Sequence, residues 1–596
     1  MSERTSELAD ATRTTRRTVL EAAGATSAAA LTTLFSRGAA ARAIDPERAT
    51  NPTAFEIDRE AAETVYPQSI ASGDPTPSGV VAWTRLSPAA YEGDEPMGIE
   101  VALDEEFETV VYRGIVPGDR IDPDHDYAVT VDLDGNLESD QRYFYRFVYD
   151  GDASRIGRCR TLPEPDASPD SVRFAVLSCN NYLQGYYGGL AHVADEDVDF
   201  IVHTGDFLYE YAGDGQQPGR DITLPSGKEL AHTLDDFRHL HRTYRSDEFM
   251  RAALEQHTLI HTWDDHEIVN NRWWNHEADA PETASHPYGD DPERMRRLYA
   301  EGIKAMTEYV PLRIRYEAGD DGTLDEDAIH ERFRLYRSFR FGDLVELFMT
   351  DERLYRTHPP DDEAGQRDTA TPPSDDQDDA DRTMLGSEQR RWFVDGVTES
   401  DATWKVWGNE VLNAALKAVN ADTGSAYLNY DAWDGYEFER RNLMGTFVRN
   451  DVENFVTLTG DMHASIAAYL KEDYKDATES EYAPDGDDHR VGVEFMTPAV
   501  SSNNLSSTTP TPEGVDEKTV EAAVKSQNPH IEWFNWSRYG YSVVEFADDH
   551  CTYVVYDVDR TVDAADAPKR LLKAYRVPEG TTELQEYDGD LLGELL

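Results

Sequence analysis

The sequence predicts an α/β protein with an all-β domain on its N-terminal side. Short strands separated by turn residues fill residues 60–163. From about residue 171, apolar strands alternate with amphipathic helices, which is typical of α/β sheets. The chain has 596 residues, of which 39% are hydrophobic, so it is long enough for two domains and apolar enough to fold.

The charge of the chain is strongly negative. It has 117 acidic and 56 basic residues, which give a formal net charge of −61. Such a surface repels nucleic-acid phosphates, so we expect no nucleic-acid-binding surface. Acidic residues occur along the whole chain. We therefore interpret the charge as the solvated surface of a halophilic protein, in which salt screens the self-repulsion.

The first residues have the features of an export signal. The sequence Thr-Arg-Arg-Thr-Val-Leu at 15–20 precedes a weakly apolar stretch, and Ala-Arg-Ala at 41–43 offers a cleavage site. An ordinary basic amphipathic terminus is the alternative. We expect residues 1–43 to be a twin-arginine signal peptide, with the twin-arginine machinery as a partner and a secreted protein as the product. No stretch is long and apolar enough for a stable membrane span.

The predicted all-β domain contains five clear strands. In Arg142–Tyr149, four aromatic residues fall on one face by the period of two that strands show. About 100 residues of this kind predict a sandwich similar to a fibronectin or immunoglobulin domain. The five strands are Gly79–Leu86, Ile99–Leu103, Thr109–Ile115, Tyr127–Leu133 and Arg142–Tyr149.

The following α/β region has three predicted helices and six predicted strands. The helices are Leu234–Gln256, Pro292–Tyr309 and Ser387–Val397, with Ser387 as the N-cap of the last. Each strand ends in polar residues, at the place where open α/β sheets bind their ligands. The strands are Val172–Leu177, Phe200–Thr204, Thr258–Trp263, Leu344–Met349, Trp404–Val406 and Phe455–Leu458.

The polar residues at these strand ends are suited to bind two metal ions. They combine hard carboxylate donors with imidazoles, and two cations close together need one shared carboxylate and several private ligands. A thiolate and a phenolate together favour Fe(III) at one position, and the oxygen donors suit Ca, Mg, Mn or Zn at the other. The donors are Cys179, Asp206, Tyr209, Asp264, Asp265, His266, Asp461 and His463.

The motifs in this order resemble those of the alkaline phosphatase D family of calcineurin-like metallophosphoesterases. They are Ser-Cys-Asn at 178–180, Gly-Asp-Phe-Leu-Tyr at 205–209, Trp-Asp-Asp-His-Glu-x-x-Asn-Asn at 263–271, Asp-x-Arg-x-Tyr-Arg at 351–356 and Gly-Asp-Met-His at 460–463. The resemblance implies a four-layer α/β/β/α sandwich as the catalytic domain, at 171–560, followed by a C-terminal extension at 561–596.

The resemblance also implies roles for single residues. Asp206 would bridge the two metals, and Cys179, Tyr209 and His463 would bind the iron. Asp265 and Asp461 would bind the second metal, and His266 would assist the leaving group. Beyond the resemblance, Arg353 is a candidate phosphate partner because of its bidentate guanidinium. The weaker candidates for ligands or supporting residues are Asp264, Asn270, Asn271 and Asn409.

Some of these residues have simpler alternative roles. Cys179 is also consistent with a buried core thiol, and Tyr209 with an aromatic cap on the sheet. Cys159, Cys179 and Cys551 allow at most one disulfide, and the sequence leaves open whether Cys159 and Cys551 pair.

Together these features predict an exported alkaline phosphatase that acts on phosphate monoesters or diesters to acquire phosphate. Hydroxide held by the two metals would attack phosphorus in line. One alternative is a phosphodiesterase that cleaves lipid or polymer diesters in the manner of a phospholipase D. A more distant one is an acidic surface-binding protein with a degenerate site.

Overall fold

The structure is a computed structural model. It describes residues 47–48, 55–57, 59–60, 63–319, 322–360, 375–418, 426–474, 490–508 and 515–587. The predicted signal peptide, residues 1–43, lies outside the described residues. Within the described part, no helix is long and apolar enough to cross a membrane.

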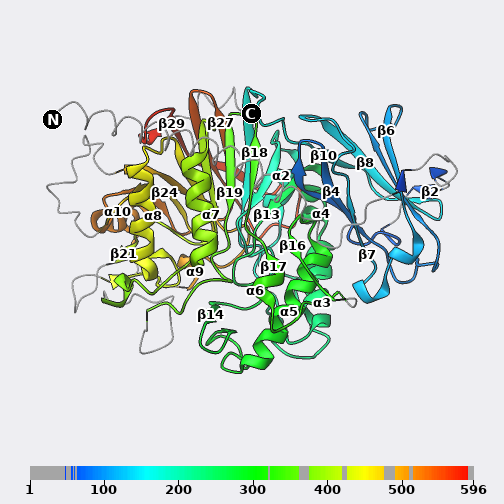
Figure 1. Ribbon diagram of the computed structural model, residues 1–596, viewed down its shortest axis with the longest axis horizontal. Coiled ribbons are helices and arrows are strands. Elements are labelled where there is room, and N and C mark those ends of the chain that lie inside the picture. Colours follow the sequence, from blue (N-terminus) through cyan, green and yellow to red (C-terminus); the bar gives the residue numbers. More distant parts are fainter. Residues whose placement is uncertain are drawn as a thin grey trace, which may run out of the picture.

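A ten-stranded sheet forms one half of the α/β core (Figure 1). Its central strands are parallel and almost wholly buried, as expected for strands that are covered on both faces. The order is β30 (Gln585–Glu586), β29 (Lys569–Pro578), β28 (His550–Val558), β27 (Gly540–Ala547), β11 (Ser171–Leu177), β12 (Phe200–His203), β13 (Thr258–His261), β3 (Ile70–Thr76), β4 (Gly79–Arg85) and β7 (Ala128–Asp132).

A seven-stranded sheet forms the other half of this core. Apolar side chains from the two sheets pack together in one buried cluster, which includes Phe174 and Val202 from the first sheet and Val406 and Leu458 from the second. The order is β18 (Arg337–Phe341), β19 (Val345–Met349), β20 (Trp404–Asn409), β23 (Phe455–Thr459), β25 (Arg490–Met496), β24 (Ser465–Lys471) and β26 (Ile531–Asn535).

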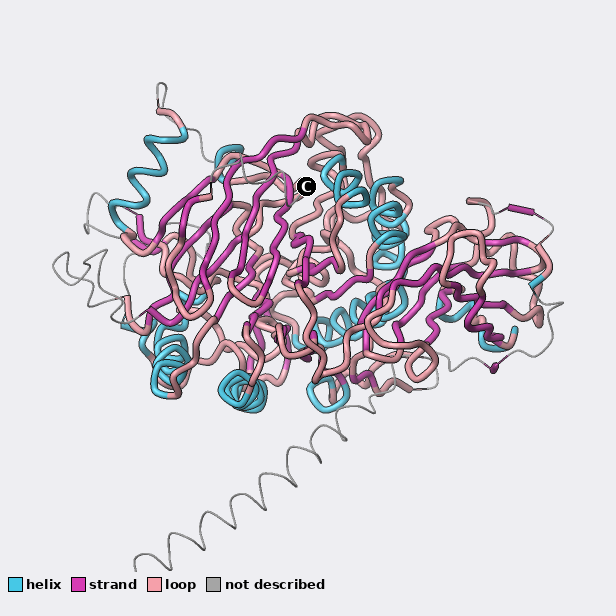
Figure 2. The backbone as a smooth tube through the Cα atoms, turned by 90° about the horizontal axis from the view of Figure 1, so that it is seen from above, coloured by secondary structure: helices cyan, strands magenta, loops and turns pink. Residues whose placement is uncertain are grey.

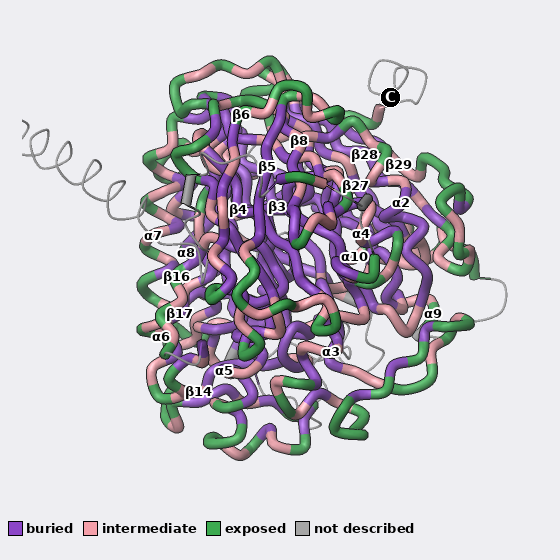
Figure 3. The backbone as a smooth tube through the Cα atoms, turned by 90° about the vertical axis from the view of Figure 1, so that its right-hand side faces the viewer, coloured by how far each residue is buried: buried purple, intermediate pink, exposed green. Residues whose placement is uncertain are grey.

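Helices cover the other face of each sheet. α7 (Gly386–Glu399) and α8 (Glu437–Arg449) pack on the seven-stranded sheet, as Figure 1 shows. The ten-stranded sheet shares a second buried cluster with α2 (Gly188–Asp195), α3 (Leu234–Arg245), α4 (Glu248–Gln256) and α5 (Pro292–Tyr309). From the side, the buried strands occupy the middle of the molecule and the exposed segments lie at its edge (Figure 3).

The helix predictions are confirmed for α5, which spans Pro292–Tyr309, and corrected for the other two. The helix predicted at Leu234–Gln256 is two helices, because Asp247 caps α4 by accepting hydrogen bonds from the backbone N–H groups of Phe249 and Met250. Ser387 is not an N-cap. α7 begins at Gly386, and the capping position is Leu385, which has no side-chain acceptor.

The N-terminal region is a β-structure that extends to one side of the core (Figure 2). Its own sheet packs on β3, β4 and β7 through an apolar cluster that includes Ile99, Tyr143 and Tyr145. The four aromatic residues predicted on one face of β8 are all buried. This sheet contains β1 (Glu47–Arg48), β6 (Val110–Val116), β5 (Met97–Ala102), β8 (Arg142–Tyr149), β9 (Asp152–Ala153), β2 (Arg59–Glu60) and β10 (Gly157–Arg160).

The ten-stranded sheet crosses both boundaries predicted for the α/β domain. On the N-terminal side β3 pairs with β13 at Gly73 and Leu259, where a Cβ on Gly73 would lie 2.3 Å from the backbone oxygen of Pro311. On the C-terminal side β29 pairs with β28 along its length. Two strands of the predicted extension, β29 and β30, therefore belong to this sheet.

The three cysteines are free and buried. Cys159 lies in the apolar cluster of the N-terminal region, whereas Cys551 lies between the two core sheets. The structure therefore contains no bridge between Cys159 and Cys551.

Candidate metal centre

Strands β11, β12 and β13 run parallel and end together at one edge of the ten-stranded sheet. Leu177 is opposite His203, and His203 is opposite His261. The segments that follow these positions carry Cys179, Asp206 and Asp264–His266 to the same place. β23 brings Asp461 and His463 there from the facing sheet.

The backbone at this edge adopts left-handed conformations that are uncommon for residues other than glycine. The φ angle is 61° at Cys179, 59° at Asp206, 68° at Asp461 and 54° at His463. Each such conformation carries a cost, and they are concentrated at functional sites. Gly205, with φ 109°, lets the chain pass close to the next strand, because a Cβ there would lie 2.4 Å from the Cβ of Asp264.

The first metal group consists of Cys179, Asp206 and His463, whose ligand atoms all lie within 4.8 Å of one another. The hydroxyl of Tyr209 contacts two members of this group. The Tyr209 hydroxyl lies 2.8 Å from Asp206 Oδ2, to which it donates, and 3.0 Å from His463 Nε2. Sulfur, phenol oxygen, imidazole and carboxylate therefore converge on one point.

The second metal group consists of Asp206, Asp265 and His266, with the same 4.8 Å limit on the ligand atoms. Asp206 belongs to both groups, so a single carboxylate connects the two positions. Asp461 belongs to neither three-residue group. Its Oδ2 atom is nevertheless buried and has no hydrogen-bond partner among the described residues.

The two groups fit bound cations. Buried carboxylate oxygens are normally paired, yet Asp461 Oδ2 and Asp264 Oδ2 are both buried without a partner. Burial, together with Asp265 and Asp264, raises the pKa of Asp206 well above its usual range against the opposing effect of His266. Positive charge at this site would stabilise the ionised forms, which is what a metal supplies.

The same burial acts on the two unusual donors. Burial and the nearby Asp206 carboxylate raise the pKa of the Cys179 thiol and of the Tyr209 phenol well above their usual ranges. These donors become strong ligands only beside a strong Lewis acid. His463 differs, because burial lowers its pKa to about 4 and leaves the ring neutral and able to coordinate.

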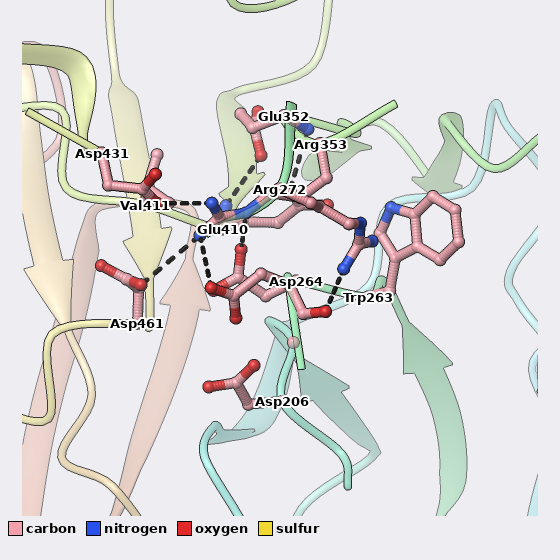
Figure 4. Close-up of polar contacts among 12 residues, drawn as sticks. Asp206, Trp263, Asp264, Arg272, Glu352, Arg353, Glu410, Val411, Asp431 and Asp461 are labelled. Carbon is pink, nitrogen blue, oxygen red and sulfur yellow. Dashed lines mark hydrogen bonds and ion pairs between the residues drawn. The ribbon is translucent and has the colours of Figure 1, made fainter. Parts of the chain in front are cut away.

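Arg353 does not fit the predicted role of a phosphate partner. Its side chain is fully buried, and its guanidinium forms ion pairs with Asp264 and Asp431 (Figure 4). Its Nη2 atom lies 3.5 Å from Asp461 Oδ1 and 3.8 Å from Asp265 Oδ2. Arg353 therefore balances the charge of four carboxylates next to the metal groups.

His266 is held by a residue that the sequence did not single out. Its Nδ1 atom lies 2.7 Å from Glu210 Oε2, and Glu210 is fully buried. Burial opposes a charge on the ring, but Glu210, Asp265 and Asp206 together raise the pKa of His266 well above its usual range. The His266 ring also lies 4.0 Å from that of Tyr209, measured between centroids.

The weaker candidates support the site in different ways. Asp264 accepts from Arg353, while the backbone N–H of Asn271 donates to Asp265 Oδ2 at 2.7 Å. The side-chain amide of Asn270 donates to Ser285, and its backbone N–H donates to Glu210 Oε1 at 2.9 Å. Asn409 is a structural residue, because its amide contacts Val411 and accepts from Trp433.

Sequence reasoning missed four supporting residues: Glu210, Asp431, Ser502 and Asn503. Glu210 comes one residue after Tyr209, so its position in the motif was a usable signal. The other three lie on loops far from the motifs they serve. No local pattern distinguishes them from the many other polar residues of the chain.

The fold agrees with the comparisons with known proteins. Profiles described as "PhoD-like phosphatase" and "PhoD-like phosphatase, N-terminal domain" match residues 174–554 and 50–163. Alkaline phosphatase D of Bacillus subtilis (strain 168) is 32% identical over 493 residues, which are 81% of this chain and 76% of that protein. A solved structure described as "Structure of PhoD" superposes with a TM-score of 0.73 at 28% identity, covering 89% of this chain and 93% of that one.

These similarities first establish the class, a phosphoric ester hydrolase. More specifically, the chain belongs to the PhoD-like phosphatase family. The resemblance found in the sequence motifs is therefore confirmed.

Proposed function

We propose that the protein is an exported, metal-dependent alkaline phosphatase that releases phosphate from monoesters, diesters or both, for phosphate acquisition. The observation that carries this proposal is the position of Asp206 in two groups of metal-capable residues at one sheet edge. A shared carboxylate is what two adjacent cations need in a two-metal hydrolase.

The types of ligand atom favour a different metal at each of the two positions. Cys179, Tyr209 and His463 would hold Fe(III) together with Asp206, because thiolate and phenolate suit a trivalent ion. Asp265 and Asp461 would hold the second ion, for which Ca fits the oxygen donors and Zn, Mn or Mg are the alternatives. Cations bound there would supply Lewis-acid activation of water and of the phosphate group.

His266 is the proposed proton donor to the leaving oxygen. Glu210 Oε2 lies 2.7 Å from its Nδ1 atom and would fix the ring, so that Nε2 would be the atom that gives up the proton. Arg353 would keep Asp264 and Asp461 in place by its ion pairs, which replaces the direct phosphate contact expected from the sequence.

Several broader features belong to the same proposal. Two facing sheets with helices outside are consistent with the four-layer sandwich of metallophosphoesterases, and the N-terminal sheets with an immunoglobulin-like sandwich that shares strands with the core. Residues 1–43 would direct twin-arginine export and give a secreted, halophilic enzyme whose activity and stability increase with salt.

The proposal is tested with p-nitrophenyl phosphate and bis-p-nitrophenyl phosphate at alkaline pH, together with metal analysis and a visible spectrum. We expect hydrolysis of at least one ester and a phenolate-to-iron band that disappears in Tyr209→Phe. Preference for the diester would identify a phosphodiesterase. A colourless zinc protein would overturn the iron assignment, and a metal-loaded protein that hydrolyses neither ester would overturn the function.

A further inference from the structure

One short turn, Ser501–Asn503, contacts three of the residues that surround the first metal group. Ser502 Oγ lies 2.7 Å from the Tyr209 hydroxyl. The backbone N–H groups of Ser501 and Ser502 donate to the Cys179 carbonyl, at 3.3 Å and 3.2 Å. The backbone carbonyl of Asn503 lies 2.7 Å from His463 Nδ1. The turn is distant in sequence from Cys179, Tyr209 and His463, yet it touches each of them.

The hydrogen bonds of this turn determine where the Ser502 proton goes. A carbonyl next to His463 Nδ1 can only accept, so Nδ1 carries the ring proton and Nε2 does not. The neighbours of the Tyr209 oxygen at Asp206 Oδ2 and His463 Nε2 are therefore both acceptors. Ser502 is the one hydrogen-bond donor to that oxygen among the contacts of the described residues.

The other acceptor within reach of Ser502 has partners of its own. Ser502 Oγ also lies 2.9 Å from the Cys179 carbonyl, but that carbonyl already receives the two backbone N–H groups. In addition, Asn181 N–H donates to Ser502 Oγ at 3.2 Å, which leaves the hydroxyl proton free to point at Tyr209. Ser502 is fully buried, so water does not compete for this proton.

We propose that Ser502 is a positioning residue for the first metal position: its hydroxyl donates to the Tyr209 oxygen and holds that oxygen toward Cys179, Asp206 and His463. This inference rests on the proposed metal centre. It adds that the binding of a phenol-ligated metal depends on a loop residue that does not touch the metal. Hydrogen bonds of this kind orient ligands and commonly change metal affinity 10–100-fold, roughly.

The loop between β28 and β29, which contains Arg560, holds the turn in place. Arg560 Nη2 donates to Asn503 Oδ1 at 2.8 Å, and Arg560 Nη1 donates to the Ser501 carbonyl. On the other side, Asn503 N–H donates to Gln184 Oε1 at 2.5 Å. The turn therefore has a fixed position independent of Tyr209, as a positioning role requires.

Ser501 provides a matched control for the test. It lies in the same turn and is also fully buried, but its hydroxyl donates to the Asn181 carbonyl at 2.9 Å and not to Tyr209. Ser501→Ala removes one buried hydroxyl and its hydrogen bond to the Asn181 carbonyl, whereas Ser502→Ala also leaves the Asn181 N–H without its acceptor. Ser502→Ala is therefore expected to destabilise the metal-free protein more than Ser501→Ala, but it is also the variant that changes the surroundings of the Tyr209 oxygen.

The experiment compares the metal-loaded wild type, Ser502→Ala and Ser501→Ala by visible spectrum and by the rate of metal loss to EDTA. A hydrogen bond stabilises the oxygen electron pair, so its removal in Ser502→Ala moves the phenolate-to-iron band to longer wavelength. Metal loss becomes about tenfold faster. Ser501→Ala keeps the wild-type band and the wild-type rate.

Equal behaviour of the two variants would overturn the inference and leave the proposed function intact. If the wild type holds metal without a visible band, the iron assignment fails, and the EDTA rates still decide the role of Ser502. A wild type that binds no metal would contradict the proposed metal centre and the inference together.

Discussion

At the scale of single residues, the site depends on charge balance beneath the metal groups. Arg353 and Arg356 are both fully buried, and both form ion pairs with Asp431. Through Arg353 this network reaches Asp264 and Asp461 (Figure 4). Two guanidinium groups and their carboxylates are removed from water here, and such burial is tolerated when the charges are paired.

Asp431→Asn tests this balance while keeping the shape of the side chain. We expect the free energy of unfolding to fall by about 3 kcal/mol or more, because two buried arginines lose their common counter-charge. Urea unfolding at fixed salt measures it. The control is Asp401→Asn, which removes an exposed partner of Arg340 and is expected to change stability by less than about 1 kcal/mol. Equal effects would show that Asp431 carries no special charge role.

Residue types and motif order were sufficient to select the residues that the structure brings together at the strand ends, including Asp206 and Tyr209. They were not sufficient for Asp431 or Ser502, because these side chains reach the site from loops whose path depends on the folded chain. The role of Arg353 was also misjudged. The sequence shows that an arginine follows a strand, but not that four carboxylates contact its guanidinium.

At the scale of elements, capping residues determine where helices begin. The helical periodicity of Leu234–Gln256 is continuous in the sequence, but the structure has two helices there. Asp247 separates them: it caps α4 and forms an ion pair with Arg220 at 2.7 Å. Arg220 is buried among the rings of Tyr182 and Tyr187. Through Asp247 and Arg220, the start of α4 is therefore connected to the segment that follows Cys179.

Asp247→Ala is expected to lower the free energy of unfolding by about 3–5 kcal/mol, since the variant loses a helix cap and leaves Arg220 buried without its carboxylate. Asp291→Ala removes the cap of α5 and an exposed ion pair with Arg294, and there we expect about 1 kcal/mol. Chemical denaturation of both variants provides the comparison. The interpretation of Asp247 as more than a cap fails if the two losses are the same.

Strand β3 shows a second limit of prediction at this scale. Its sequence contains Gly73-Asp74-Pro75, which has the composition of a turn, so no strand was expected there. The glycine is required because β3 passes close to the segment at Pro311. A long-range approach of this kind leaves no periodic signal, whereas β8, with its alternating aromatic residues, was predicted at its observed bounds.

At the scale of the whole molecule, the buried core contains histidines that remain neutral. Burial, with Arg245 and Arg242 nearby, lowers the pKa of His241 to about 3. Its ring stacks on Tyr309 with centroids 5.1 Å apart. In the unfolded chain the same histidine titrates near its usual pKa of about 6.5. The stability that comes from keeping this histidine neutral is therefore fully present above that pH, and it is lost as the pH falls toward the pKa of the folded protein.

His241→Phe removes this source of acid sensitivity. At pH 5 the unfolded wild type gains about 2 kcal/mol from protonation of this histidine, and the phenylalanine variant does not. We therefore expect the variant to be more stable relative to the wild type at pH 5 than at pH 7, by about that amount. Denaturant unfolding at both values of pH measures the difference. A stability difference that does not change with pH would contradict it.

The central claim is that one carboxylate, Asp206, serves two metal positions. The most direct measurement is the metal content of Asp206→Asn compared with the wild type, together with hydrolysis of p-nitrophenyl phosphate and its bis ester. Asparagine tolerates the left-handed backbone that this position adopts, so the fold is expected to persist, as circular dichroism would show. We expect the variant to lose both metals and the hydrolytic activity. A folded Asp206→Asn protein that keeps the wild-type metal content and activity would contradict it.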